Sequence, residues 1–218
     1  MAKTAENKEI RASYGEMTAF PRMAVGVMGS AGGHLQLKAR KLLDTLGTEI
    51  GRRGFVLVTG AAPGLPHDAV LGAKNVGGLV VGISPALNFA EHVQKYKAPI
   101  AGYDVLIYTG SGVMGREIEN IRTCDVVIIA GGRSGTLGEF AIAYDEGKVI
   151  GVLTGTGGIA DHIKDLLPII NKETGATLVY EDDPVKLMDR LEAVYRDRVL
   201  PRYLALSEGA ASGGVLEK

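Results

Sequence analysis

The segment that follows residue 125 contains residue types that bind anions. A strand-like run, Asp125–Ala130, is apolar after its first residue and is typical of a strand buried on both faces. Six small or polar residues follow it: Gly131, Gly132, Arg133, Ser134, Gly135 and Thr136. If a helix begins here, three features face one point. They are the free N–H groups from Ser134 to Leu137, the hydroxyls of Ser134 and Thr136, and the positive end of the helix dipole. Arg133 would add a cationic contact, so the segment predicts a phosphate pocket at a strand-to-helix turn.

Glu139 is a candidate for acid–base chemistry beside this pocket. Its spacing from Thr136 is that of a capping box, so the carboxylate either binds the backbone of its own helix start or acts on a ligand, and both roles stay open. First-turn side chains lean toward the helix N-terminus, where the phosphate would lie. At about 100° per residue, Glu139 lies opposite the predicted apolar stripe of this helix, which consists of Leu137, Phe140, Ala141 and Tyr144.

The helix-like stretch before this strand carries a polar face. Four residues share it at the spacing i, i+3, i+4, i+7: Arg116, Glu119, Asn120 and Thr123. One interpretation is a solvated face with a weak Arg116–Glu119 ion pair. The other is that Arg116 and Asn120 belong to the ligand site.

Glycines follow other predicted strands as well, and three residues there are further candidates for phosphate binding: Gly29, Ser30 and Gly60. The Gly-Lys-Ser/Thr ending of a Walker loop is missing, and residues 26–33 do not read G-x-G-x-x-G. Thr59-Gly60 stands where a dinucleotide-binding protein offers an acidic partner for the ribose. Nucleotide triphosphate hydrolysis and bound NAD are therefore not expected.

Metal and pyridoxal chemistry are not expected either. The four histidines are isolated in the sequence and the chain has one cysteine, Cys124, so we expect neither a metal site nor an internal disulfide. Lysines are few near the glycine loops, which gives no support to a Schiff-base enzyme. We expect no cofactor.

Strand-like and helix-like runs alternate along the chain and position these loops. The predicted strands are Arg22–Met28, Phe55–Thr59, Leu79–Ser84, Asp104–Tyr108, Asp125–Ala130, Val149–Leu153 and Thr177–Tyr180. The predicted helices are Leu35–Arg52, Pro66–Asn75, Ala90–Tyr96, Val113–Thr123, Gly135–Glu146, Gly158–Ile169 and Pro184–Tyr195. This alternation predicts a single α/β domain, a doubly wound Rossmann-like fold with a mostly parallel sheet of about seven strands and helices on both faces. Ligands of such sheets bind outside the carboxyl ends of the strands, where the glycines fall.

Composition and charge predict the organisation and the partners. Residues 21–198 form the predicted domain, with a flexible segment at 1–20 and a flexible tail at 199–218. The chain has 24 Lys plus Arg against 25 Asp plus Glu, so we expect neither nucleic acid nor a membrane surface as a partner. The polar N-terminus has no apolar signal core, and no apolar run approaches the roughly 18 residues that span a bilayer, which favours the cytoplasm.

Residues 25–194 resemble the Lonely Guy (LOG) family and its relatives, which include molybdenum cofactor carrier proteins and proteins labelled lysine decarboxylases. The family pattern is M-x-x-R-K, then S-D, a hydrophobic run and P-G-G-x-G-T-x-E-E. The chain follows it without gaps if the family's Arg is placed two residues after Met114, at Arg116; Asp125, Gly132, Gly135, Thr136 and Glu139 then keep the family's separations. Four positions differ from the pattern: Glu117 for Lys, Gly131 for Pro, Arg133 for Gly and Gly138 for the first Glu.

The resemblance implies a catalytic role for Arg116 and Glu139, the pair that cuts the N-glycosidic bond of a nucleoside 5′-monophosphate in the family. Two functions stay open: a nucleoside monophosphate-binding protein with phosphoribohydrolase activity, or a non-catalytic carrier or sensor of a phosphorylated ligand such as molybdenum cofactor. Gly138 and Arg133 favour the carrier, whereas Arg116 and Glu139 favour the enzyme. A plain oligomeric scaffold is a third hypothesis. The resemblance also implies a homodimer or a higher homo-oligomer.

Overall fold

A computed structural model describes residues 21–212, and the flexible segment predicted at 1–20 lies outside them. Their centre is a seven-stranded sheet in the order β4-β3-β2-β1-β5-β6-β7. Every pair of neighbouring strands is parallel. The strands are β1 (Ala24–Gly29), β2 (Val56–Thr59), β3 (Leu79–Ser84), β4 (Val105–Tyr108), β5 (Val126–Ala130), β6 (Val149–Leu153) and β7 (Thr177–Glu181).

The central strands are apolar on both sides because the sheet has a hydrophobic core on each face. In β1, Val25 and Val27 belong to one core and Met28 to the other. Every residue of β5 and of β6 is buried. Continuous Val/Ile runs are what a parallel sheet covered by helices on both faces requires.

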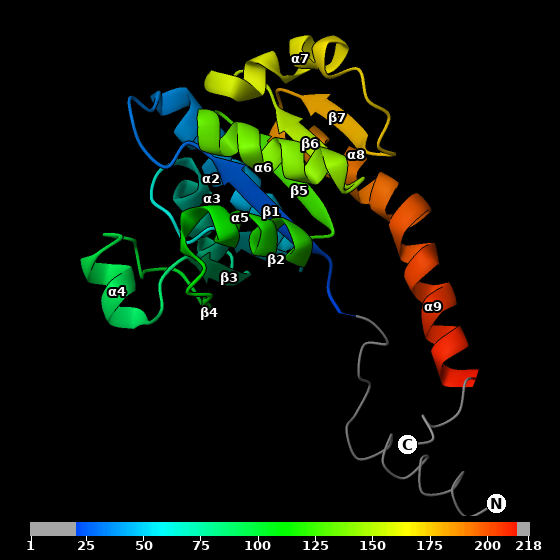
Figure 1. The fold of residues 1–218 in the computed structure, drawn as a ribbon, viewed down its shortest axis with the longest axis horizontal. Helices are drawn as coiled ribbons and strands as arrows, with labels where there is room; N and C mark the ends of the chain where they lie inside the picture. The colour runs from blue at the N-terminus through cyan, green and yellow to red at the C-terminus, as the bar shows by residue number, and fades with distance from the viewer. Residues whose placement is uncertain (1–20, 213–218) are drawn as a thin grey trace, which may run out of the picture.

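Helices cover both faces of the sheet (Figure 1). One core includes residues of α2 (Leu37–Arg52), α3 (Leu65–Asn75) and α8 (Pro184–Val194). The opposite core includes residues of α5 (Gly112–Thr123), α6 (Ser134–Asp145), the 3₁₀ helix η1 (Gly158–His162) and α7 (Ile163–Ile170). The short α4 (Phe89–Gln94) lies in the connection between β3 and β4. The doubly wound fold predicted from the alternation is confirmed, with a sheet that is wholly parallel.

The chain after α8 is helical up to Ser212. A π-helical turn, η2 (Tyr195–Val199), leads into α9 (Leu200–Ser212), which extends away from the sheet in Figure 1. The Tyr203 hydroxyl donates to Asp125 Oδ1 at 2.8 Å, and Leu200 packs against the core. The composition of residues 199–218 predicts a flexible tail, but these two contacts hold the start of a helix ahead of its glycine- and serine-rich end. Residues 213–218 lie outside the described part.

The strand order reverses between β1 and β5, and the loops after these strands meet there. Gly29 pairs with Ala130 at the ends of the two strands. A Cβ at Gly29 would lie 2.3 Å from the Ala130 carbonyl oxygen, so only glycine permits this approach. Open α/β sheets bind ligands at such a switch point, and the predicted phosphate loop begins directly after Ala130.

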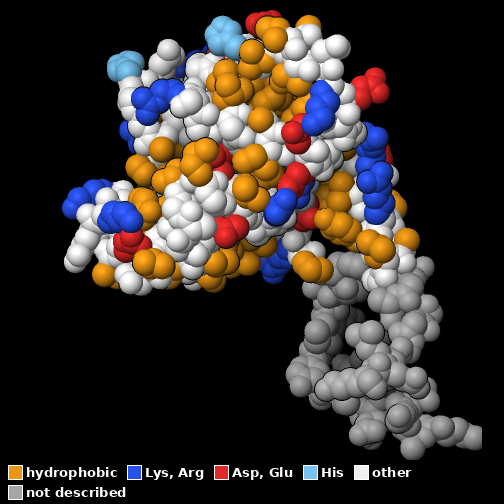
Figure 2. All heavy atoms as spheres, in the orientation of Figure 1, with side chains coloured by type: hydrophobic (Ala, Val, Ile, Leu, Met, Phe, Trp, Pro, Cys, Tyr) orange, Lys and Arg blue, Asp and Glu red, His pale blue; other side chains and the backbone are white. Residues whose placement is uncertain are grey.

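Part of the surface near the β4 edge is apolar. We call β4-edge surface the exposed residues of β4, α4, α5 and their connections: Leu87, Phe89, Val105, Ile107, Val113 and Met114. Figure 2 shows apolar side chains among charged ones over α4 and α5. Within residues 21–212, no helix combines the length and the apolar character needed to cross a membrane.

Candidate functional site

The loop between β5 and α6 turns sharply because it begins with two glycines. Gly131 and Gly132 have φ angles of +60° and +95°, a region that side-chain-bearing residues rarely adopt. A Cβ at Gly132 would also lie 2.3 Å from the Thr136 Cβ. The turn thus brings the first residues of α6 directly over the end of β5.

Two amides of this loop are held by hydroxyls of neighbouring loops. The Gly131 N–H donates to Thr156 Oγ1 at 2.8 Å, and the Gly132 N–H donates to Ser30 Oγ at 2.6 Å. These bonds fix the loop between the ends of β1 and β6 and leave neither amide for a ligand. Ser30 therefore fixes the position of the predicted phosphate loop, because its hydroxyl oxygen accepts from the Gly132 amide.

Three amides at the start of α6 are available to an anion. The N–H groups of Ser134, Gly135 and Thr136 have no acceptor within residues 21–212, and no side chain caps α6. The Leu137 N–H donates to the Arg133 carbonyl at 2.9 Å, so its predicted place among the free donors is wrong. The reason is that the carbonyl of the N-cap residue, here Arg133, accepts the first i→i−4 hydrogen bond of a helix.

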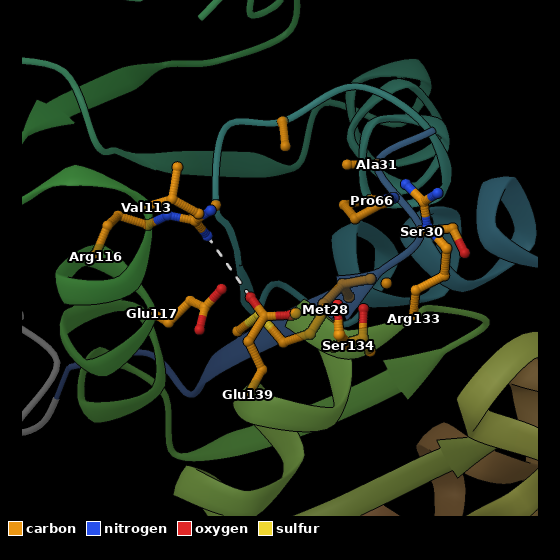
Figure 3. Close-up of a pocket in the computed structure, with 16 residues that line it drawn as sticks. Met28, Ser30, Ala31, Pro66, Val113, Arg116, Glu117, Arg133, Ser134 and Glu139 are labelled. Atoms are coloured by element: carbon orange, nitrogen blue, oxygen red, sulfur yellow. Dashed lines mark ion pairs between the residues drawn. The ribbon is translucent and has the colours of Figure 1, made fainter. Parts of the chain in front are cut away.

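Arg116 and Glu139 come together from facing helices. Arg116 Nη1 of α5 lies 3.6 Å from Glu139 Oε1 of α6, and each side chain is 9% exposed. Neither side chain makes a hydrogen bond within the described residues, and the buried Arg116 Nε has no partner. Figure 3 shows both groups directed into the same hollow. A buried guanidinium with unused donors is costly, and an anionic ligand would satisfy it.

The pKa of the Glu139 carboxyl is raised to about 7, chiefly because burial disfavours the charged form. Arg116 lowers this pKa and Glu117 raises it. A carboxyl with a pKa near 7 can give or accept a proton at neutral pH, which is the property required of a general acid or base.

Two of the open interpretations of these helices do not hold, and one prediction about them is corrected. The capping box is absent, because α6 begins at Ser134 and Arg133 is its N-cap, which places Glu139 in the second turn. Ala141 of the predicted stripe is exposed, whereas Glu139 lies on the buried side of α6 that faces α5. The Arg116–Glu119 pair does not form, because the Glu119 carboxylate accepts from Ser111 Oγ at 2.8 Å on the exposed side of α5.

Glu117 is a site residue that the sequence reasoning missed. It is 4% exposed, and its carboxylate oxygens lie 3.5 and 3.6 Å from where Cβ atoms at Gly138 and Gly135 would stand. Burial raises its pKa, opposed by Arg116. The available signal was the pair of glycines three residues apart on the facing helix, which opens space for one longer side chain.

A cavity of about 300 Å³ lies between these elements. Nine of the predicted site residues line it: Gly29, Ser30, Gly60, Arg116, Arg133, Ser134, Gly135, Thr136 and Glu139. Gly131 is buried in the turn, and Gly132 lines a second cavity of about 310 Å³ that shares Ser30 and Arg133 with the first. Asn120 lies behind the wall, where its Nδ2 donates to Met28 Sδ at 3.0 Å. In residues 21–212 no group of three or more side chains is arranged to hold a metal ion.

Comparisons with known proteins agree with this architecture. The model of the SLOG cluster4 family matches residues 22–188. An uncharacterized protein of Archaeoglobus fulgidus is 32% identical over 131 residues, which are 60% of this chain and 80% of that protein. The molybdenum cofactor binding protein of Rippkaea orientalis is 27% identical with a TM-score of 0.66, over 81% of this chain and 99% of that one. The molybdenum cofactor carrier protein of Chlamydomonas reinhardtii is 25% identical with a TM-score of 0.62, over 79% and 99%.

Proposed function

The chain belongs to the SLOG cluster4 family, and from this premise we propose that it binds a nucleoside 5′-monophosphate and hydrolyses its N-glycosidic bond. The observation that carries the proposal is the buried Arg116 guanidinium, which has no hydrogen-bond partner in the described chain and lies in the cavity that also holds free amides. An anionic ligand would supply the missing acceptors.

The phosphate would bind at the start of α6. Its oxygens would accept from the N–H groups of Ser134, Gly135 and Thr136, with the helix dipole favouring the negative charge. The hydroxyls of Ser134 and Thr136 and the exposed guanidinium of Arg133 stand at the same cavity. The ribose would then lie toward Arg116 and Glu139, which line the adjoining wall.

Glu139 would act on the glycosidic bond. Cleavage of this bond builds positive charge on the ribose, which a carboxylate stabilises, and the same carboxylate can activate water. Arg116 would bind the ribose or phosphate and orient Glu139 through their ion pair. Positioned acid–base groups typically contribute about 10²–10⁴-fold in rate.

The test measures free base released from AMP, GMP, CMP and UMP by the full-length protein. Release by the wild type and a loss of about 10²-fold or more in Glu139→Gln would support hydrolysis. Glu146→Gln changes a carboxylate just beyond α6 that pairs with Arg122 and does not line the cavity, and it serves as the matched control. Wild-type release no greater than that of Glu139→Gln refutes the enzymatic function.

A non-catalytic carrier or sensor is the second candidate. The names of the two solved relatives, which bind or carry molybdenum cofactor, favour it. The extra cation Arg133 also suits a ligand that is held rather than converted, such as a pterin phosphate. Tight calorimetric binding of a phosphorylated ligand without turnover of any of the four monophosphates would support this candidate.

We also propose a homo-oligomer formed through the β4-edge surface. Met114 is 76% exposed and Leu87 is 71% exposed there, and a second copy of the chain would cover these apolar side chains. A monomeric mass of the full-length protein in light scattering would contradict this proposal. The cytoplasmic location and the absence of a nucleic-acid partner stay predictions from the sequence.

A further inference from the structure

The cavity contains a second buried carboxyl, that of Glu117, which the proposed function has not used. Glu117 is 4% exposed and lines the same cavity as Glu139. Its carboxylate makes no hydrogen bond and no ion pair within residues 21–212. A buried carboxyl without donors is costly unless it is protonated or meets a ligand.

The local sequence of α6 opens the space that Glu117 occupies. Gly135 and Gly138 face α5 one turn apart, and Cβ atoms at these positions would stand 3.6 and 3.5 Å from the Glu117 oxygens. Figure 3 shows the carboxylates of Glu117 and Glu139 directed toward one another from α5 and α6. Two carboxyl groups so placed do not both ionise cheaply, so the charged form of one favours the protonated form of the other.

We propose that Glu117 is a second catalytic residue of this site and forms an acid–base pair with Glu139. The inference rests on the proposed hydrolysis. In the singly protonated pair, the carboxylate takes a proton from water as the water oxygen bonds to C1′ of the ribose. The carboxylic acid gives its proton to the leaving ring nitrogen as the C1′–N bond breaks. Ribose 5-phosphate and the neutral base leave, and the pair again holds one proton.

Other charged groups surround the pair and set its protonation. Arg116 on α5 lowers the pKa of both carboxyls, whereas Glu117 raises that of Glu139. Arg133 stands at the cavity rim, and the buried Cys124 thiol, whose pKa is raised to about 12, is neutral and donates to the Asn120 carbonyl at 3.0 Å. Removing the Glu117 charge therefore lowers the pKa of Glu139.

The experiment compares wild type, Glu117→Gln, Glu139→Gln and the control Glu119→Gln, which changes an exposed carboxylate on the same helix. Base release from the four monophosphates is measured against pH, and the carboxyl carbons of glutamate are titrated by NMR. We expect Glu117→Gln to lower kcat about 10²-fold with little change in KM, to remove one limb of the pH profile, and to lower the Glu139 midpoint.

The outcomes separate this inference from the proposed function. An active wild type with an equally active Glu117→Gln overturns the inference alone. A Glu117→Gln variant with reduced activity but an unchanged pH profile and Glu139 midpoint shows a purely structural role and also overturns it. A wild type that releases no base overturns the hydrolytic function and the catalytic role of Glu117 together.

Discussion

Replacing Glu139 by Gln is expected to change the pH dependence of folding stability in a defined direction. The carboxyl has a pKa of about 7 in the folded protein against an ordinary value near 4.5. The folded state therefore binds this proton more tightly than the unfolded state. Between these two pH values the folded chain holds more protons, so the free energy of unfolding falls as the pH rises. The stabilisation is complete below about pH 4.5 and is lost as the pH passes 7.

The size of the effect follows from the same two values. The rise from 4.5 to about 7 corresponds to about 3 kcal/mol at 1.36 kcal/mol per pKa unit. Gln has nearly the same shape and no charge at any pH. The free energy of unfolding of Glu139→Gln, minus that of the wild type, is therefore expected to increase by about 3 kcal/mol from pH 4.5 to pH 8.

Urea unfolding at a series of pH values measures this difference directly. All groups that titrate alike in both proteins cancel from it, so the difference reports Glu139 together with Glu117, the carboxyl that is coupled to it. The variant Glu119→Gln, which removes an exposed negative charge from α5, controls for net charge. A stability difference between Glu139→Gln and wild type that does not change with pH refutes the assignment of a buried, unsatisfied carboxyl.

Three substitutions test the packing around the site. Gly60→Ala would place a Cβ 1.8 Å from Arg116 Nη1 and displace the guanidinium. Because the ligand then loses about 1.5–3 kcal/mol of binding free energy, we expect calorimetry to show 10- to 100-fold weaker AMP binding. The melting temperature should stay nearly unchanged. Ser30→Ala removes the acceptor of the Gly132 N–H, and chemical unfolding should show a loss of about 1–2 kcal/mol. Gly47→Ala sets a Cβ 1.8 Å from the Ala69 carbonyl oxygen where α2 meets α3, and we expect about 3 kcal/mol of destabilisation. A Ser30→Ala or Gly47→Ala variant as stable as the wild type would contradict this packing.

The fold could be predicted from the sequence because its signals are local. Buried parallel strands need apolar residues on both sides, and the runs in β5 and β6 have them at every position. Turns that require positive φ need glycine, and Gly131 and Gly132 mark one such turn. Each of these signals lies within a few residues of the element that it predicts.

The site could be predicted only in part because its contacts join distant elements. The sequence indicated an anion pocket after β5, but it did not reveal that Ser30 and Thr156 hold the Gly132 and Gly131 amides. It placed Arg116 beside Glu119 on one helix, whereas the ion pair of Arg116 crosses to α6. Spacing within a helix reports which side chains share a face, and it does not report which face meets another helix.

The position of Glu117 changes how the motif differences weigh on function. Gly138 stands where the LOG pattern has its first Glu, which by itself favours a carrier. In this chain the Glu117 carboxylate approaches from α5 to 3.5 Å from where the Cβ of residue 138 would stand. The hollow thus retains two carboxyl groups and one guanidinium, although one carboxyl comes from the opposite helix. Gly138 therefore no longer favours a carrier over a hydrolase. The motif difference that still favours a carrier is Arg133 at the cavity rim. Titration and turnover of the Glu117 and Glu139 variants then decide between the two.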